Sequence, residues 1–206
     1  MPDATPSPAT VSATTRAAID AFATTQPWDD TQDFDDAERG FVARSEIRQI
    51  TADDGRVVWD LDAYSFLDAP VPDTANPSLW RQGQLLIKDG LYEVADGIYQ
   101  LRGYDLSVMS IIEGDSGIIV IDPLLTREPA TAAFALYTAH RGERPVKAMI
   151  YTHSHLDHFG GVKGIISQEQ VDAGEVMVIA PEGFMHHAIA ENVFVGTAMA
   201  RRAGYM

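Results

Sequence analysis

A short apolar run, VKAMIYT at 146–152, leads directly into a cluster of chelating side chains. Within six positions lie three histidines and one aspartate, and two glycines follow: His153, His155, Asp157, His158, Gly160 and Gly161. On an extended segment, side chains two apart point the same way, so His153, His155 and Asp157 are expected to share one face. His158 then begins the next helix, and the glycines let that backbone approach the site. The sequence therefore predicts a buried strand that ends at a metal centre.

The cluster offers two pairs of ligands, His153 with His155 and Asp157 with His158. Two imidazoles suit one zinc ion, and a carboxylate with an imidazole suits a second. Two such ions, about 3.5–4 Å apart, hold and ionise a water between them. The alternative is a set of surface histidines with Asp157 capping a helix. Three histidines and an aspartate at the end of an apolar strand favour the metal site.

Composition limits the other ligands and the partners. The chain has 206 residues and no cysteine, so thiolate zinc sites, disulfides and cysteine nucleophiles are excluded. A transition metal must therefore be held by imidazole and carboxylate. The 30 acidic and 15 basic side chains give a formal charge of -15. Without a basic stripe to neutralise phosphate, this charge predicts no binding to nucleic acid.

The sequence also carries expectations about location. No apolar run approaches the roughly 20 residues that a membrane-spanning helix needs, so no membrane span is expected. The N-terminal stretch, MPDATPSPATVSATTRAAIDAF, lacks a basic start and an apolar segment, and it predicts no secretory signal. A cytoplasmic location is the expectation, with periplasmic and secreted locations left open.

Composition divides the chain into an N-terminal arm and a main domain. Residues 1–15 are largely Pro, Ser, Thr and Ala, which bury little surface, and they predict a flexible start. Residues 1–75 are expected to form this arm and a wrapping extension, and 76–206 the first part of the main domain. Short elements are expected along the way: a helix at 15–23, a strand at 57–67, and helical or turn segments at 80–86 and 91–94.

In the main domain, strands alternate with helices. Three β-rich runs separated by turn signals predict a meander: GIYQLRG, LSVMSIIEG and GIIVIDP. Thr126 is expected to cap a helix over 128–140. The elements expected after it are a strand at 146–152, a helix at 162–169, a strand at 176–180, and helices at 181–191 and 197–203. This order predicts a layered α/β (α+β) body.

HSHLDH at 153–158 matches the HxHxDH signature of the metallo-β-lactamase superfamily, where it also follows a buried strand. GIIVIDP resembles the first motif of that family, in which the aspartate, Asp122 here, ends a strand beneath the metal site and supports the loop. Simple turn chemistry is the alternative for Asp122. The resemblance implies an αββα sandwich with a two-zinc site along one edge, and this chain would contain only the first half.

A narrower resemblance extends over about residues 76–206. NPSLWRQGQL, the run from IYQLRGYDLSVM to HFGGVKG, and PEGFMHHAIAENVFVGTAMARRAGYM are similar to the alkyl sulfatases, the linear primary and secondary alkylsulfatase group. The resemblance implies zinc-dependent hydrolysis of alkyl sulfate esters, such as dodecyl sulfate, to an alcohol and inorganic sulfate. It also implies a homodimer in the full-length form.

The resemblance also assigns roles. His153 and His155 serve one zinc, Asp157 and His158 serve the other, and Asp157 has a catalytic role. Family members are much longer and supply further ligands, including a bridging glutamate, so this chain is expected to be an N-terminal portion with weak or no activity of its own. Four polar residues on one predicted helix are expected to form only a solvated face: Glu182, His186, His187 and Glu191.

Two other functions are alternatives. One is a different hydrolase of the same superfamily, of the lactamase or thioesterase type. The runs DLSVMSIIEGDSG and AENVFVGTAMARRAGYM argue against it. The other is a non-catalytic metal-binding or assembly module, which the missing ligands favour for this chain as it stands.

Overall fold

The computed structural model describes residues 10–204, so residues 1–9 of the predicted flexible arm lie outside the described residues. The chain divides into two compact units. The first combines Met1–Glu38 with Ala63–Lys88, and the second combines Arg39–Asp62 with Asp89–Met206. This division differs from the predicted boundary at 75/76, because part of the expected extension contributes a strand to the main sheet.

Helices make up the first unit. They are α1 (Ala13–Ala23), α2 (Gln32–Glu38), a 3-10 turn (Ser65–Asp68) and α3 (Pro77–Leu86). Ser12 caps α1 and Asn76 caps α3, each through a side-chain oxygen that accepts a backbone N–H, and Pro77 occupies the first turn of α3. The predicted helix at 15–23 is confirmed, and the segment at 80–86 is the greater part of α3.

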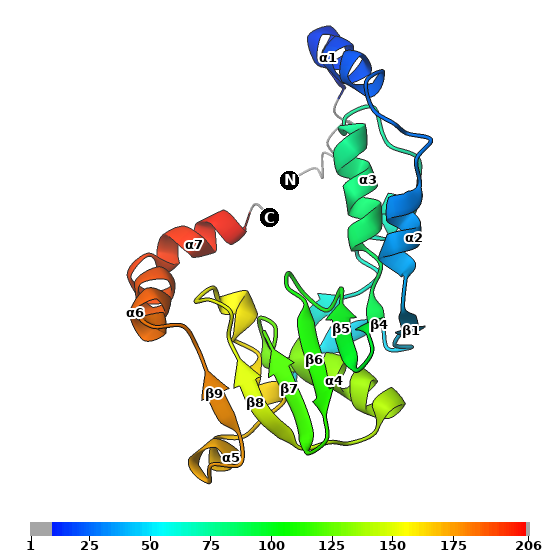
Figure 1. The fold of residues 1–206 in the computed structure, drawn as a ribbon. Coiled ribbons are helices and arrows are strands. Elements are labelled where there is room, and N and C mark those ends of the chain that lie inside the picture. The colour runs from blue at the N-terminus through cyan, green and yellow to red at the C-terminus, as the bar shows by residue number, and fades with distance from the viewer. Residues whose placement is uncertain (1–9, 205–206) are drawn as a thin grey trace. The chain divides into compact units, whose positions relative to one another are not determined.

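A seven-stranded sheet is the centre of the second unit (Figure 1). Its strands, in sheet order, are β1 (Phe41–Ala43), β4 (Gly90–Ala95), β5 (Ile98–Arg102), β6 (Met109–Gly114), β7 (Gly117–Ile121), β8 (Val146–Ile150) and β9 (Met177–Ile179). Neighbours are antiparallel from β1 to β7, whereas β8 is parallel to both β7 and β9. Strands β2 (Gln49–Thr51) and β3 (Val57–Asp60) form a separate antiparallel pair.

The core lies between the sheet and α4 (Arg127–Arg141), the helix that joins β7 to β8 and crosses behind the sheet in Figure 1. Alternate residues of β5 and β6 are fully buried, namely Tyr99, Leu101, Met109 and Ile111. Because side chains alternate between the two faces of a strand, one face of each strand packs on the core. The predicted meander and the layered α/β body are therefore confirmed.

The segment at 91–94 is a strand, β4, and not the predicted helical or turn element. Leu91 and Tyr92 are both buried, so the apolar residues do not alternate and the period of two is hidden in the sequence. Strand β4 pairs with β1 on one side and β5 on the other. Pairing with neighbouring strands therefore decides its conformation.

The remaining helices follow β8. They are a 3-10 turn (Leu156–His158), a second one (Val162–Gly164), α5 (Gln168–Asp172), α6 (Phe184–Ile189), a π-helical turn (Ala190–Phe194) and α7 (Gly196–Ala203). The predicted single helix at 162–169 is thus two pieces, and Ser167 starts the second with a capping box that includes Gln170. No helix between residues 10 and 204 is long and apolar enough to cross a bilayer.

One largely buried carboxylate, that of Glu113, joins the end of α4 to the sheet. Glu113 on β6 accepts hydrogen bonds from Arg141 Nε at 3.0 Å, Arg141 Nη2 at 3.1 Å and the Tyr137 hydroxyl at 2.9 Å. Its side chain is only 10% exposed. The Arg141 hydrogen bonds are the main reason that the pKa of Glu113 lies below its usual value, and they outweigh the opposing effect of burial.

Replacing Glu113 by glutamine is expected to lower the free energy of unfolding at pH 7 by about 1–3 kcal/mol, the usual value of hydrogen bonds to a charged group. Because the folded pKa is depressed, this contribution is present above the unfolded value near 4.5 and is lost as the pH falls below it. Urea unfolding at pH 7, 5, 4 and 3 measures the effect, with the exposed Glu143→Gln as a control. A stability difference that stayed constant from pH 6 to pH 3 would contradict the assignment.

Candidate metal centre

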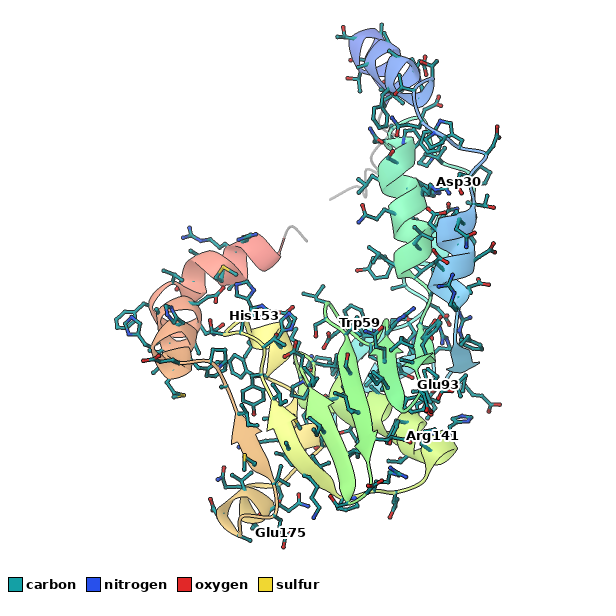
Figure 2. All side chains as sticks on the ribbon, viewed as in Figure 1. Asp30, Trp59, Glu93, Arg141, His153 and Glu175 are labelled. Carbon is teal, nitrogen blue, oxygen red and sulfur yellow. The ribbon has the colours of Figure 1, made fainter. Side chains whose placement is uncertain are left out.

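The histidine loop, residues 151–161, begins where two parallel strands end. β7 ends at Ile121 and β8 ends at Ile150, and the pair is in register there. Because parallel strands have their carboxyl ends at the same edge of the sheet, Asp122 and the loop from Tyr151 onwards meet at that edge. Figure 2 labels His153 on the loop that leaves β8. The sheet topology therefore brings the two motifs of the sequence together.

Backbone contacts hold this loop against the segment that follows β7. An added Cβ would lie 2.1 Å from the Leu125 carbonyl oxygen at Gly160 and 2.2 Å from that of Pro123 at Gly161. At Gly164 it would lie 2.4 Å from the Arg127 carbonyl oxygen. The glycines therefore allow two loops to touch, a different close approach from the predicted one of a helix to the metal site.

The three predicted histidines converge. The ring centroids of His153 and His155 are 4.6 Å apart, and those of His153 and His158 are 4.0 Å apart. The Nε2 atom of His158 lies 3.3 Å from Asp157 Oδ2. The local conformation differs from the prediction, because His158 ends a short 3-10 turn and does not begin a helix.

Asp122 fixes the geometry of the loop. It has a φ of 55°, a left-handed conformation that aspartate tolerates better than most residues. Its carboxylate accepts hydrogen bonds from Thr152 N at 2.9 Å, Thr152 Oγ1 at 2.7 Å and His158 Nδ1 at 2.8 Å. Of the two interpretations of Asp122, support of the loop is the one that these contacts fit.

These hydrogen bonds also determine which ring nitrogens are free. With Asp122 accepting from His158 Nδ1, the neutral imidazole keeps its lone pair on Nε2. The Thr152 hydroxyl donates its only proton to Asp122. Its oxygen therefore accepts a hydrogen bond from His153 Nδ1 at 3.0 Å. The Nε2 atoms of His153 and His158 are therefore the nitrogens available to a metal.

The donor chemistry fits zinc. An unprotonated His158 Nε2 and an ionised Asp157 Oδ2 are both acceptors, so their approach to 3.3 Å becomes favourable when a cation or a proton lies between them. Support of a ligand histidine by a carboxylate, as Asp122 supports His158, is usual at zinc sites. Within residues 10–204, however, no three His, Asp or Glu side chains are placed to hold one ion together. The described chain thus offers only pairs of possible ligands.

Glu191 lies closer to the cluster than the sequence indicated. Its Oε1 atom is 3.4 Å from His155 Nε2, and its side chain is 25% exposed, so it is not simply part of a solvated face. The residue lies in the π-helical turn, a rare element that often occurs at functional sites. Because the π-helical turn departs from the spacing of a regular helix, the sequence pattern gave no indication of this contact.

Two further residues contact the loops of the site, and the sequence did not indicate this role for them. Asp105 is 9% exposed and accepts hydrogen bonds from Leu125 N at 2.6 Å and Ser107 N at 2.8 Å. Ser107, also buried, donates its hydroxyl proton to the backbone oxygen of Asp157. Burial raises the pKa of Asp105, while the two N–H groups oppose that effect. The run GYDLSVM carries the only sequence signal, a polar Asp-x-Ser pair within an apolar stretch.

Comparison with known proteins agrees with this geometry. The family model of the metallo-β-lactamase superfamily matches residues 102–203, which include β6 to β9 and the histidine loop. This part of the chain belongs to the superfamily. The chain as a whole is similar to several alkylsulfatases.

The similarity to alkylsulfatases covers most of this chain. A linear primary-alkylsulfatase from Pseudomonas is 52% identical over 93% of the chain, and an alkyl/aryl-sulfatase from Saccharomyces cerevisiae is 49% identical over 87%. The solved stereoselective inverting sec-alkylsulfatase from Pseudomonas is 50% identical over 96% of the chain, with a TM-score of 0.88. The chain spans only 28–31% of the length of these three relatives.

Proposed function

We propose that this chain is part of a zinc-dependent alkylsulfatase, which hydrolyses alkyl sulfate esters such as dodecyl sulfate to an alcohol and inorganic sulfate. One observation carries the proposal. A chain about half identical to several alkylsulfatases places its HSHLDH loop at the sheet edge with His158 held by Asp122. Similarity of this extent is far more specific than the six-residue motif alone.

In this proposal, His153 and His155 hold one zinc ion, and Asp157 and His158 hold the other. Bound zinc would supply Lewis acidity, an activated water, and positive charge against the anionic ester. The chain itself carries a formal charge of -15, which repels a sulfate ester, so a local positive charge is needed at the site.

The supporting residues have defined tasks. Asp122 accepts from His158 Nδ1 and so keeps the lone pair of His158 Nε2 available. It does the same for His153 Nε2 indirectly, through the Thr152 hydroxyl. Asp157 contributes a carboxylate beside His158 and is the proposed catalytic residue of the chain. Orientation of ligands before the metal arrives reduces the cost of assembling the site.

Further ligands would complete each site in a longer protein. Two observations support this part of the proposal: the chain spans about three tenths of its relatives, and its described residues offer only ligand pairs. We therefore propose that the 206-residue chain alone binds zinc weakly and turns over little or no ester. A homodimeric full-length form, which rests on the resemblance, and a cytoplasmic location are further proposals.

The activity test uses sulfate release from dodecyl sulfate below its micelle concentration. A full reading frame that contains residues 1–206 is expected to release sulfate with zinc present and to lose this activity with a chelator. The 206-residue chain alone is expected to release little. A His158→Ala variant of the longer protein, which removes one proposed ligand, serves as the inactive control.

Three results would contradict the proposal. Hydrolysis of lactams or thioesters but not of sulfate esters would indicate another hydrolase of the superfamily. Absence of zinc binding by the longer protein would remove the metal site. Robust, chelator-sensitive sulfate release by the 206-residue chain alone would refute the proposed need for further ligands.

A further inference from the structure

We infer that Ser107 is a positioning residue for the proposed metal ligand Asp157, an inference that rests on the proposed function. The contact joins the loop after β5 to the histidine loop, 50 positions further along the chain. Ser107 Oγ donates its proton to the backbone oxygen of Asp157. This bond fixes the peptide group of Asp157 and hence the point from which its side chain reaches His158.

The hydroxyl has one proton, so its direction is decided by the surrounding acceptors. Asp105 Oδ1 lies 3.4 Å from Ser107 Oγ and is already engaged with Ser107 N at 2.8 Å. The Asp157 carbonyl oxygen is the nearer acceptor and receives the proton. Because Ser107 is only 6% exposed, water competes little for this bond.

Asp105 in turn holds Ser107 in place. One of its carboxylate oxygens accepts from Ser107 N and the other accepts from Leu125 N, on the loop that begins with Asp122. On that same loop, the carbonyl oxygen of Leu124 accepts a hydrogen bond from Gly161 N at 2.8 Å. Two buried carboxylates therefore support the cluster: Asp122 orients His158 through its ring, and Asp105 acts on Asp157 through Ser107.

The hydrogen bond connects Ser107 to only one of the two proposed ligand pairs, Asp157 with His158. Its contact is with Asp157, which neighbours His158, whereas the structure gives no hydrogen bond between Ser107 and His153 or His155 among the described residues. Loss of the hydroxyl is therefore expected to weaken zinc binding at the Asp157–His158 pair and to spare the His153–His155 pair.

The first test is zinc titration by calorimetry on a full reading frame that contains residues 1–206, because the 206-residue chain alone is proposed to bind zinc weakly. Ser107→Ala is expected to lower the zinc affinity of one binding event by about 10–100-fold, the usual effect of losing an outer partner of a ligand. Ser107→Thr, which keeps the hydroxyl, is expected to restore most of the affinity. Ser110→Ala on β6 is the matched control and is expected to bind zinc like the unmodified chain.

The second measurement needs neither zinc nor activity. Hydrogen exchange of the metal-free chain is expected to become faster at residues 156–160 in Ser107→Ala and to stay unchanged there in Ser110→Ala. Faster exchange through the whole sheet would assign Ser107 to folding and overturn the inference. Unchanged exchange at 156–160, or unchanged zinc affinity in Ser107→Ala, would also overturn it while leaving the proposed function intact.

Failure of the proposed function gives a different result. The unmodified longer protein would then bind no zinc, even in a chelator-free buffer with excess metal. That outcome overturns the role of Ser107 toward a metal ligand as well, whatever the exchange data show.

Discussion

Substitution of Asp122 by asparagine is expected to lower the zinc affinity of the histidine loop by about 10–100-fold, as loss of a carboxylate that supports a ligand histidine usually does. Asparagine has the same shape and tolerates the φ of 55° at this position. Its amide NH₂, however, cannot accept the His158 Nδ1 proton. The ring would then favour the tautomer with the proton on Nε2, the nitrogen that a metal needs.

The expected loss extends to His153. Thr152 gives its hydroxyl proton to Asp122, and this direction makes its oxygen an acceptor for His153 Nδ1. If the asparagine amide donates to Thr152 Oγ1, the Thr152 hydroxyl donates its own proton to His153 Nδ1. The His153 ring would then carry its proton on Nε2, as the His158 ring does. One atom exchange thus affects one nitrogen in each proposed ligand pair.

Zinc affinity of the longer protein can be measured by competition with a coloured chelator, and its fold by circular dichroism. Asp115→Asn, in the exposed turn between β6 and β7, changes the net charge equally and is the control. Its zinc affinity is expected to equal that of the unmodified chain. If Asp122→Asn bound zinc as tightly as the control, the proposed role of Asp122 would be wrong.

The largest expected effect on stability comes from Asp89. Its carboxylate is 4% exposed and receives Arg48 Nη1 at 2.7 Å and Nη2 at 2.9 Å, with Arg44 Nε at 3.3 Å. The Asp89 hydrogen bond is the main reason that the pKa of Arg48 is raised. Asp89→Ala would leave the Arg48 guanidinium half-buried without its main partner, and the expected loss is about 3–5 kcal/mol of unfolding free energy.

The same arginine provides the control. Arg48 Nε also contacts Asp62 at 2.9 Å, but the Asp62 side chain is 58% exposed. Asp62→Ala is therefore expected to cost at most about 1 kcal/mol, because water screens an exposed pair. Urea unfolding of both variants gives the comparison. Equal losses in the two variants would show that burial does not govern this pair.

The sequence predicted the part of the site whose residues lie close together along the chain. HSHLDH places the proposed ligands within six positions, and the meander from β5 to β7 has short turns and clear alternation. Local patterns of this kind determine the conformation without help from distant segments. The fold class and the place of the cluster after a buried strand therefore followed from the sequence.

The supporting contacts could not be predicted in this way, because they join distant positions. Ser107 meets Asp157 across 50 residues, and Glu191 approaches His155 from a π-helical turn. Strand β4 was hidden for the same reason, since β1 pairs with it across about 50 residues. Neither spacing nor composition carries information about such pairs.

The glycine contacts between the two loops have a consequence for how the site could be altered by engineering. Gly160, Gly161 and Gly164 lie against carbonyl oxygens between Pro123 and Arg127, where α4 begins, and even a methyl group has no room there. A library that varies the loop should therefore keep these three positions fixed and place its diversity at Ser154 and Leu156. Because the two loops touch through their backbones, the positions of the proposed ligands depend on both loops.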